Sequence, residues 1–206
     1  QQASLSLAVE HPLPFIPNAK IATTSLETDG MTTISTELNY GGETFAANSE
    51  LSSNFDVSYT DYTLYYEIFD NGLLSFDIGL TGRDFDGDVT VTSRVNTAAE
   101  GATPVYNTTS GSIATDEMVP MLYAATSVGL PFTGFNVFAE GNFLAIDDHS
   151  LYDYQAGISY EVVDNIAVDF NLTLGYRSVK LSLEDIDNLY TDLEFKGVFA
   201  GAVVHF

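Results

Sequence analysis

The sequence contains no cysteine and no tryptophan, and only six lysines and arginines stand against 29 aspartates and glutamates. Without cysteine, the chain has no disulfide scaffold, no thiolate zinc site and no cysteine nucleophile. The formal net charge of −23 excludes a nucleic-acid partner, because neutralising phosphates requires positive charge. No apolar run reaches the roughly 20 residues that a transmembrane helix needs. No signal peptide precedes Gln1, so we expect that it has been removed or that the chain is a fragment.

Apolar residues are nevertheless abundant, at 45% of the chain with 13% aromatic residues. This composition argues against a disordered acidic segment, which has too few apolar residues to form a core. The length of 206 residues suits one domain, since single barrels reach this size without splitting.

Hydrophobic residues alternate with small or polar ones along most of the chain. In 166–176 every even-numbered residue is apolar, and Arg177 continues the polar odd-numbered face. Segments 62–68, 74–83 and 152–162 repeat the pattern. Alternation over about ten residues is typical of transmembrane barrel strands. Because lipid requires every backbone group to be paired, only helices and closed barrels span it.

The pattern therefore predicts an all-β, antiparallel up-and-down transmembrane β-barrel, a single domain over 1–206, in the outer membrane of a Gram-negative bacterium. A soluble sandwich or lipocalin-like barrel also alternates. It fits less well because one face of the best strands is wholly apolar and aromatic residues gather near the strand ends. The predicted lipid-facing residues are Leu74, Phe76, Ile78, Leu80, Ile158, Val168, Phe170, Leu172 and Leu174. The predicted aromatic girdle comprises Tyr62, Tyr66, Tyr152, Tyr160, Tyr176 and Phe206.

Short turns are predicted at 70–72, 131–134 and 163–165. Their lengths keep the apolar faces continuous, because residues paired across a hairpin point to the same side. Outer-membrane barrels have short periplasmic turns and long outer loops. We therefore expect these turns to be periplasmic, together with 11–18. Longer polar connections are expected on the outside, at 38–50, 84–118, 145–150 and 182–189.

Nine strands are predicted, an odd number. They cover 3–10, 18–36, 51–69, 73–84, 119–130, 135–145, 150–163, 166–182 and 189–206. Bacterial single-chain barrels have an even number of strands, with both termini periplasmic. We therefore expect a tenth strand upstream in the complete protein, and a gap or strained closure between 3–10 and 189–206. An eight-stranded barrel with one element miscounted is the alternative.

Two stretches resemble a family of small proteobacterial outer-membrane β-barrel proteins of unknown function. The segment Glu10–Asn18 resembles the first inner turn of that family, and Asp192–Phe206 resembles its last strand; the similarity extends to Tyr65-Tyr66-Glu67. The resemblance implies a signal peptide and one further strand, and no activity, ligand or catalytic residue. The terminal Phe206 is similar to the signal that the barrel-assembly machinery reads.

Charged residues occupy the predicted inner face. They are Asp61, Glu67, Asp77, Arg83, Glu140, Asp153, Glu161, Asp169 and Arg177. The hairpin registers place Asp153 diagonal to Arg177 and Asp61 diagonal to Arg83. Such pairs either plug the lumen, as the side chains of small barrels usually do, or line a narrow ion path.

Two further clusters resemble reactive or metal sites. The cluster 147–150 (Asp-Asp-His-Ser) suggests hydrolysis, but adjacent residues on a strand point to opposite faces, so His149 cannot readily act on Ser150. Asp84, Asp86 and Asp88 have part of the spacing of a calcium loop but lack its closing bidentate glutamate. We therefore expect no cofactor and no metal site, with Asp84, Asp86 and Asp88 as a weak candidate.

We expect a non-enzymatic barrel with a structural or envelope-surface role. A narrow channel for ions or for small, apolar solutes is the alternative, and an outer-membrane hydrolase is a third reading. The expected partners are outer-membrane lipid and lipopolysaccharide, the barrel-assembly machinery, and divalent cations at the acidic outer loops.

Overall fold

The structure, a computed structural model, describes residues 3–11, 13, 15–96, 106–146, 149–164, 168–186 and 189–205. The described residues form strands and turns, and they contain no helix long and apolar enough to cross a membrane. The strands are β1 (Ala3–Val9), β2 (Asn18–Thr33), β3 (Leu38–Tyr40), β4 (Glu43–Phe45), β5 (Glu50–Asp70), β6 (Leu74–Asn96), β7 (Tyr106–Leu130), β8 (Phe135–Ile146), β9 (His149–Asp164), β10 (Asp169–Ile186) and β11 (Leu189–His205).

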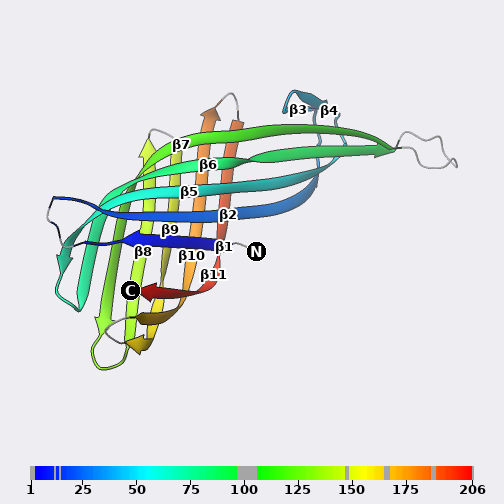
Figure 1. The fold of residues 1–206 in the computed structure, drawn as a ribbon. Helices are drawn as coiled ribbons and strands as arrows, with labels where there is room; N and C mark the ends of the chain where they lie inside the picture. The colour runs from blue at the N-terminus through cyan, green and yellow to red at the C-terminus, as the bar shows by residue number, and fades with distance from the viewer. Residues whose placement is uncertain are drawn as a thin grey trace. The chain divides into compact units, whose positions relative to one another are not determined.

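Nine of these strands form one antiparallel sheet, in the order β1-β2-β5-β6-β7-β8-β9-β10-β11 (Figure 1). Each strand is hydrogen-bonded to the next one along the chain, apart from the separate hairpin β3–β4. The predicted all-β class, antiparallel arrangement and nine wall strands are confirmed. The sheet is open, with β1 and β11 at its edges, and it is not closed into a barrel.

The chain divides into two compact units. Unit 1 comprises Gln1–Leu7, Ile21–Asp61 and Arg83–Val119, and unit 2 comprises Ala8–Lys20, Tyr62–Gly82 and Pro120–Phe206. The boundary falls within β1, β2, β5, β6 and β7, so each of these strands contributes to both units.

The predicted turn 131–134 lies where expected, whereas the turn predicted at 70–72 comprises residues 71–73, because β5 continues to Asp70 and β6 begins at Leu74. Leu130 pairs with Phe135 across the turn 131–134, and the register continues to Leu122 opposite Phe143. At the turn after β5, the Asn71 side chain accepts hydrogen bonds from the backbone N–H groups of Leu73 and Leu74. Such local bonds from asparagine stabilise tight turns, and Gly72 supplies the positive φ of 78°.

The third predicted turn, 163–165, is wrong in its first two residues. Val163 and Asp164 belong to β9, and Asp164 pairs with Asp169 of β10. The register then shifts between Phe170 and Asn171. A bulge of this kind inserts one unpaired residue, and a count of turn length cannot foresee it.

The predicted long outer connections are wrong for most of their length. β6 continues to Asn96 and β7 begins at Tyr106, so most of 84–118 is strand. β8 reaches Ile146, β9 begins at His149, and β10 extends to Ile186. Serine, threonine and aspartate are frequent in these stretches. In β6 beyond Arg83 the apolar residues lie on the odd-numbered face, so the continuous even-numbered apolar face on which the prediction relied ends there although the strand continues.

The segment 38–50 is likewise no irregular loop, because it contains the hairpin β3–β4. Gly41 and Gly42 have φ angles of 59° and 79°, the pair of positive values that a tight type I′ turn requires. The hairpin belongs to the core of unit 1, in which Phe45 packs with Leu51 and Val91. The Tyr40 hydroxyl donates a hydrogen bond of 3.0 Å to the carbonyl oxygen of Val89, which fixes the hairpin to β6.

Candidate functional site

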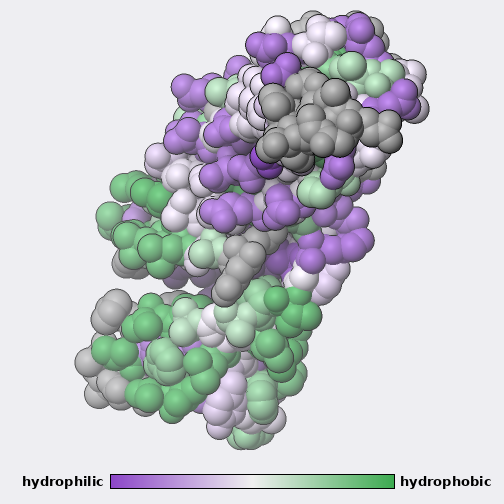
Figure 2. Space-filling model, turned by 90° about the vertical axis from the view of Figure 1, so that its right-hand side faces the viewer, coloured by the Kyte–Doolittle hydropathy of each residue, from purple (hydrophilic) through white to green (hydrophobic). Residues whose placement is uncertain are grey.

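In unit 2, one face of the sheet exposes large apolar side chains. On β5 these include Tyr62 and Leu64, whereas the alternate residues Thr63 and Tyr65 are buried. The other predicted lipid-facing and girdle residues that are exposed are Tyr66, Leu74, Phe76, Ile78, Leu80, Ile158, Tyr160, Leu172, Leu174 and Tyr176. Val168, Phe170 and Tyr152 are partly exposed. Hydrophobic side chains also gather in continuous patches on the face drawn in Figure 2.

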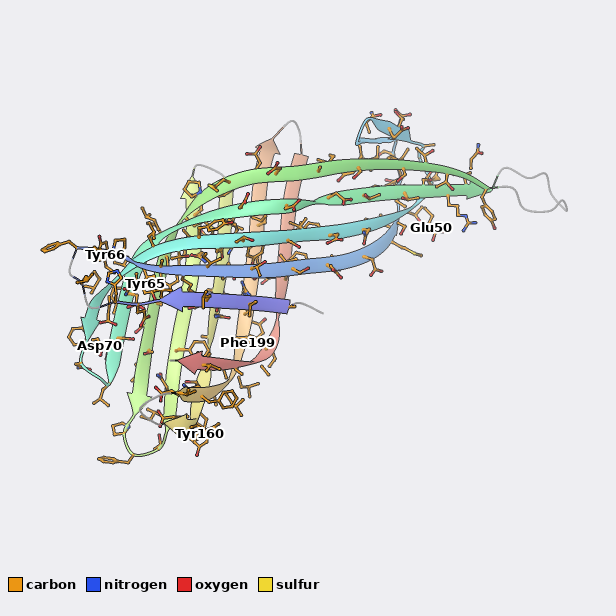
Figure 3. All side chains as sticks on the ribbon, in the orientation of Figure 1. Glu50, Tyr65, Tyr66, Asp70, Tyr160 and Phe199 are labelled. Atoms are coloured by element: carbon orange, nitrogen blue, oxygen red, sulfur yellow. The ribbon has the colours of Figure 1, made fainter. Side chains whose placement is uncertain are left out.

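In unit 1, the two faces of β5 exchange character: the exposed side chains are polar and most of the buried ones are apolar. On β5, Val57 and Tyr59 are buried, whereas the alternate residues Asn54 and Asp56 are exposed. The even-numbered face of β5 therefore changes from polar to apolar between Thr60 and Tyr62. Figure 3 shows the two ends of the strand, with Glu50 at one and Tyr66 and Asp70 towards the other.

β6 shows the same exchange, between Leu80 and Asp84. Asp84, Asp86 and Asp88 follow on the even-numbered face, so they lie along a strand rather than in the predicted loop. Among the described residues, no group of three or more acidic or histidine side chains could hold a metal ion. The Asp88 carboxylate instead accepts a 2.7 Å hydrogen bond from the Thr90 hydroxyl.

The inner face of unit 1 carries a buried ion pair where the exchange occurs. The Arg83 guanidinium donates two hydrogen bonds to the Asp61 carboxylate, from Nε to Oδ1 and from Nη2 to Oδ2, each of 2.7 Å. The side chain of Arg83 is 0% exposed and that of Asp61 is 6% exposed. The guanidinium also lies 3.8 Å from the ring centroid of Tyr59. The sequence predicted the ion pair but not the aromatic contact.

Unit 2 contains the second predicted ion pair. Arg177 donates from Nε and Nη2 to the two carboxylate oxygens of Asp153, at 2.9 Å each. Arg177 pairs in register with Gln155, which places Asp153 at the diagonal position on β9, as predicted. Bidentate pairs of this kind fix geometry better than a single charged contact.

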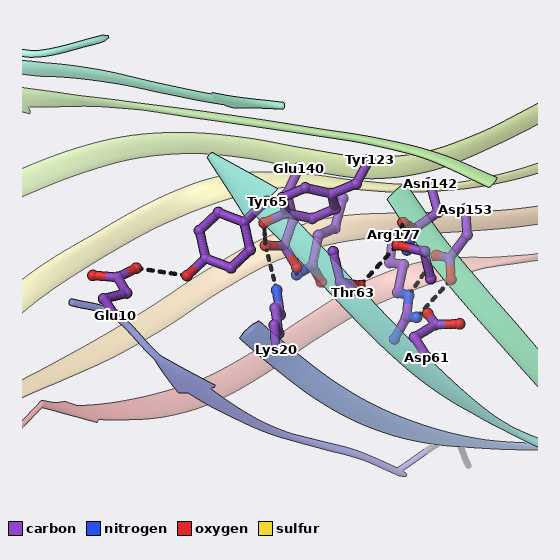
Figure 4. Close-up of polar contacts among 12 residues, drawn as sticks. Glu10, Lys20, Asp61, Thr63, Tyr65, Tyr123, Glu140, Asn142, Asp153 and Arg177 are labelled. Atoms are coloured by element: carbon purple, nitrogen blue, oxygen red, sulfur yellow. Dashed lines mark hydrogen bonds and ion pairs between the residues drawn. The ribbon is translucent and has the colours of Figure 1, made fainter. Parts of the chain in front are cut away.

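A second polar group in unit 2 centres on Glu140 (Figure 4). Its carboxylate accepts hydrogen bonds of 2.7 Å from the Lys20 ammonium and from the Gln155 side-chain amide. The hydroxyl of Tyr65 donates to Glu10 at 2.7 Å. The contact between Lys20 and Glu140 joins residues 120 positions apart, so no count across a hairpin could have found it.

The remaining predicted inner-face residues differ in how far they are buried. Glu67 and Glu161 are exposed, whereas Asp77 and Asp169 are half-buried. Phe206, Asp147 and Asp148 lie outside the described residues, as does the side chain of His149, so the cluster suggestive of hydrolysis has no described geometry.

No protein-family model, curated protein or solved structure matches this chain.

Proposed function

We propose that the chain is an integral outer-membrane β-barrel protein with a structural or envelope-surface role and no catalytic activity. The observation that carries the proposal is the exposed apolar face of unit 2. Isolated apolar side chains are ordinary on a soluble protein, but contiguous apolar surfaces mark contact with a protein or a membrane. The resemblance of Glu10–Asn18 and Asp192–Phe206 to small proteobacterial outer-membrane barrels points the same way.

The proposal includes closure of the sheet by a further strand. In nine alternating antiparallel strands, the edge strands β1 and β11 run in the same direction. One strand antiparallel to both would pair with each edge and give the even number that bacterial barrels have. An edge left open in lipid would carry unpaired N–H and C=O groups, each costing several kcal/mol.

The paired inner face favours a passive role over conduction. Lys20 and Arg177 both form ion pairs, with Glu140 and Asp153 respectively, and such contacts hold side chains across the interior of a small barrel. A narrow channel is the second candidate, supported by the polar character of the same residues. In planar bilayers we expect no stepwise conductance; reproducible steps would favour the channel.

Insertion of two arginine variants into vesicles tests the membrane assignment. Leu172 is 49% exposed, and its neighbour Thr173 points to the opposite face. Leu172→Arg should insert poorly, since arginine on the lipid face near mid-membrane costs about 2–4 kcal/mol. Thr173→Arg is the matched control on the inner face and should insert better.

The readout is the fraction of each variant that floats with the vesicles. Equal insertion of the two variants would contradict the assignment of faces. Failure of the unmodified chain to float with vesicles would contradict the proposed function itself.

A further inference from the structure

The six basic residues are distributed unevenly over a chain of net charge −23. Lys20, Arg83 and Arg177 point inward and form the ion pairs described above. Arg94 lies in unit 1, with its guanidinium 4.3 Å from the ring centroid of Tyr106. The remaining two, Lys180 and Lys196, lie on the neighbouring strands β10 and β11 of unit 2.

Both lysines lie on the face that carries the exposed apolar residues. Lys196 pairs in register with Ser178, and Lys180 pairs with Glu194. Residues directly opposite each other point to the same side of a sheet, so the even-numbered face of β10 that exposes Leu172 and Leu174 also carries Lys180. The two lysines are diagonal neighbours, about 7–8 Å apart at their backbones, which long side chains can bridge.

Aromatic side chains adjoin the lysines on the same face. Tyr154 of β9 pairs in register with Ser178, and Tyr176 of β10 precedes it on that face. Both tyrosines are exposed, at 46% and 44%. About 9–11 residues of a tilted strand cross the hydrocarbon core, and a similar number separates Asp169 from Lys180. Under the proposed function, tyrosines followed by lysines therefore lie at the outer membrane–water interface, where such residues anchor to headgroups.

We propose that Lys180 and Lys196 bind the phosphate of an anionic lipid in the outer leaflet. The inference rests on the proposed membrane location and adds a specific ligand to it. Each ammonium has three N–H donors, and the ion pair that Lys196 forms with Glu194 at 2.7 Å is exposed, at 55% and 40%. Exposed pairs of this kind are weak, so a phosphate can replace or join the carboxylate. Tyr154 and Tyr176 pack beneath the headgroup.

The test counts lipid molecules retained by the protein after transfer from vesicles, by native mass spectrometry. The vesicles are phosphatidylcholine alone or phosphatidylcholine with a minor fraction of phosphatidic acid. The unmodified protein should retain phosphatidic acid. The double variant Lys180→Gln/Lys196→Gln should retain it about 25-fold less, at about fivefold for each lysine near an anionic surface.

Arg94→Glu is the matched control, because it changes the net charge by the same two units away from the site. It should retain phosphatidic acid as the unmodified protein does. Glu194→Gln should increase retention, since it removes the carboxylate that competes for Lys196. Equal losses in Arg94→Glu and in the double lysine variant would overturn the site and leave only general charge repulsion.

Two further outcomes are informative. If excess inorganic phosphate displaces the retained lipid, the site recognises free phosphate and the assignment to lipid is wrong. If the unmodified protein does not insert into phosphatidylcholine vesicles, both the proposed function and the site are overturned. If it inserts but retains phosphatidic acid no better than the double variant does, only the site is overturned.

Discussion

The guanidinium carbon of Arg83 lies 3.8 Å from the ring centroid of Tyr59. The ring of Tyr59 is itself 2% exposed and packs against Phe85 at a centroid distance of 5.6 Å. A buried arginine needs such contacts in addition to its Asp61 partner, because removing charge from water is costly. Arg83, Asp61 and Tyr59 form a buried cluster in unit 1.

Replacement of Arg83 by methionine should destabilise the protein by about 3–5 kcal/mol, since it leaves the Asp61 carboxylate buried without its partner. The double variant Arg83→Met/Asp61→Leu should recover most of this loss, because both charges of the buried pair are removed together. Denaturant unfolding of the detergent-refolded protein measures both. Arg94→Met is the control for an exposed cation–π contact and should cost about 0.5–1 kcal/mol. A double variant as unstable as Arg83→Met would show that the pair itself, and not the unpaired charge, governs stability.

Single cysteines should locate the exchange of faces on β5. The chain has no native cysteine, so labelling of an introduced thiol has no background. In vesicles, Asp56→Cys should react with a membrane-impermeant maleimide, whereas Leu64→Cys on the same face should be protected by lipid. Both should react after unfolding in detergent. Equal labelling of the two thiols in vesicles would mean that the change from polar to apolar residues on β5 does not coincide with the membrane surface.

Alkaline pH should loosen the β3–β4 hairpin. Burial raises the pKa of the Tyr40 phenol above its usual value of 10.0, and the negative charge of Asp88 raises it further. A raised pKa means that folding favours the neutral phenol. The contribution to stability is complete below pH 10 and is lost as the pH rises through the higher value of the folded state.

Thermal unfolding of Tyr40→Phe against pH measures this contribution. The variant should lose about 0.5–1.5 kcal/mol at neutral pH with the hydrogen bond to Val89. Its stability should then fall less steeply above pH 10 than that of the unmodified protein. Tyr106→Phe, at an exposed position of β7, should retain the original pH profile. Parallel profiles for all three proteins would exclude Tyr40 as the source.

Added salt should raise the melting temperature, because acidic side chains repel one another across a chain of net charge −23. The carboxylates of Asp84, Asp86 and Asp88 share one face of β6, but no group of three metal ligands lies close together among the described residues. We therefore expect sodium and calcium salts of matched ionic strength to act equally. A larger effect of calcium would point to bridging of carboxylates by divalent cations.

The wall strands were predictable where apolar and polar residues alternate. The segment 135–145 became β8, and the four-residue turn at 131–134 fixed its register with β7. The outer part of β6 was not predictable in this way. Beyond Arg83 its even-numbered face is polar, beginning with three aspartates and two threonines, and its odd-numbered face becomes largely apolar. The continuous even-numbered apolar face therefore ends there, although the strand continues.

The polar contacts were predictable only where they join the two strands of one hairpin. Asp153 and Arg177 lie on consecutive strands, so turn length and period two placed them within reach. Lys20 and Glu140 come from strands that the sequence does not place side by side, so no hairpin register relates them. The even position of Lys20 on β2, opposite in face to the exposed Ile21, was the one available signal.

The exchange of faces on β5 and β6 has a mechanical consequence for a protein held in a bilayer. A shift of one strand repeat, two residues or about 6.6 Å, would carry either Thr60 into hydrocarbon or Tyr62 out of it. Neighbouring β6 would at the same time move Asp84 or Leu80 across the same boundary. If the protein spans the membrane as proposed, both directions are therefore opposed, and the strands themselves resist vertical displacement.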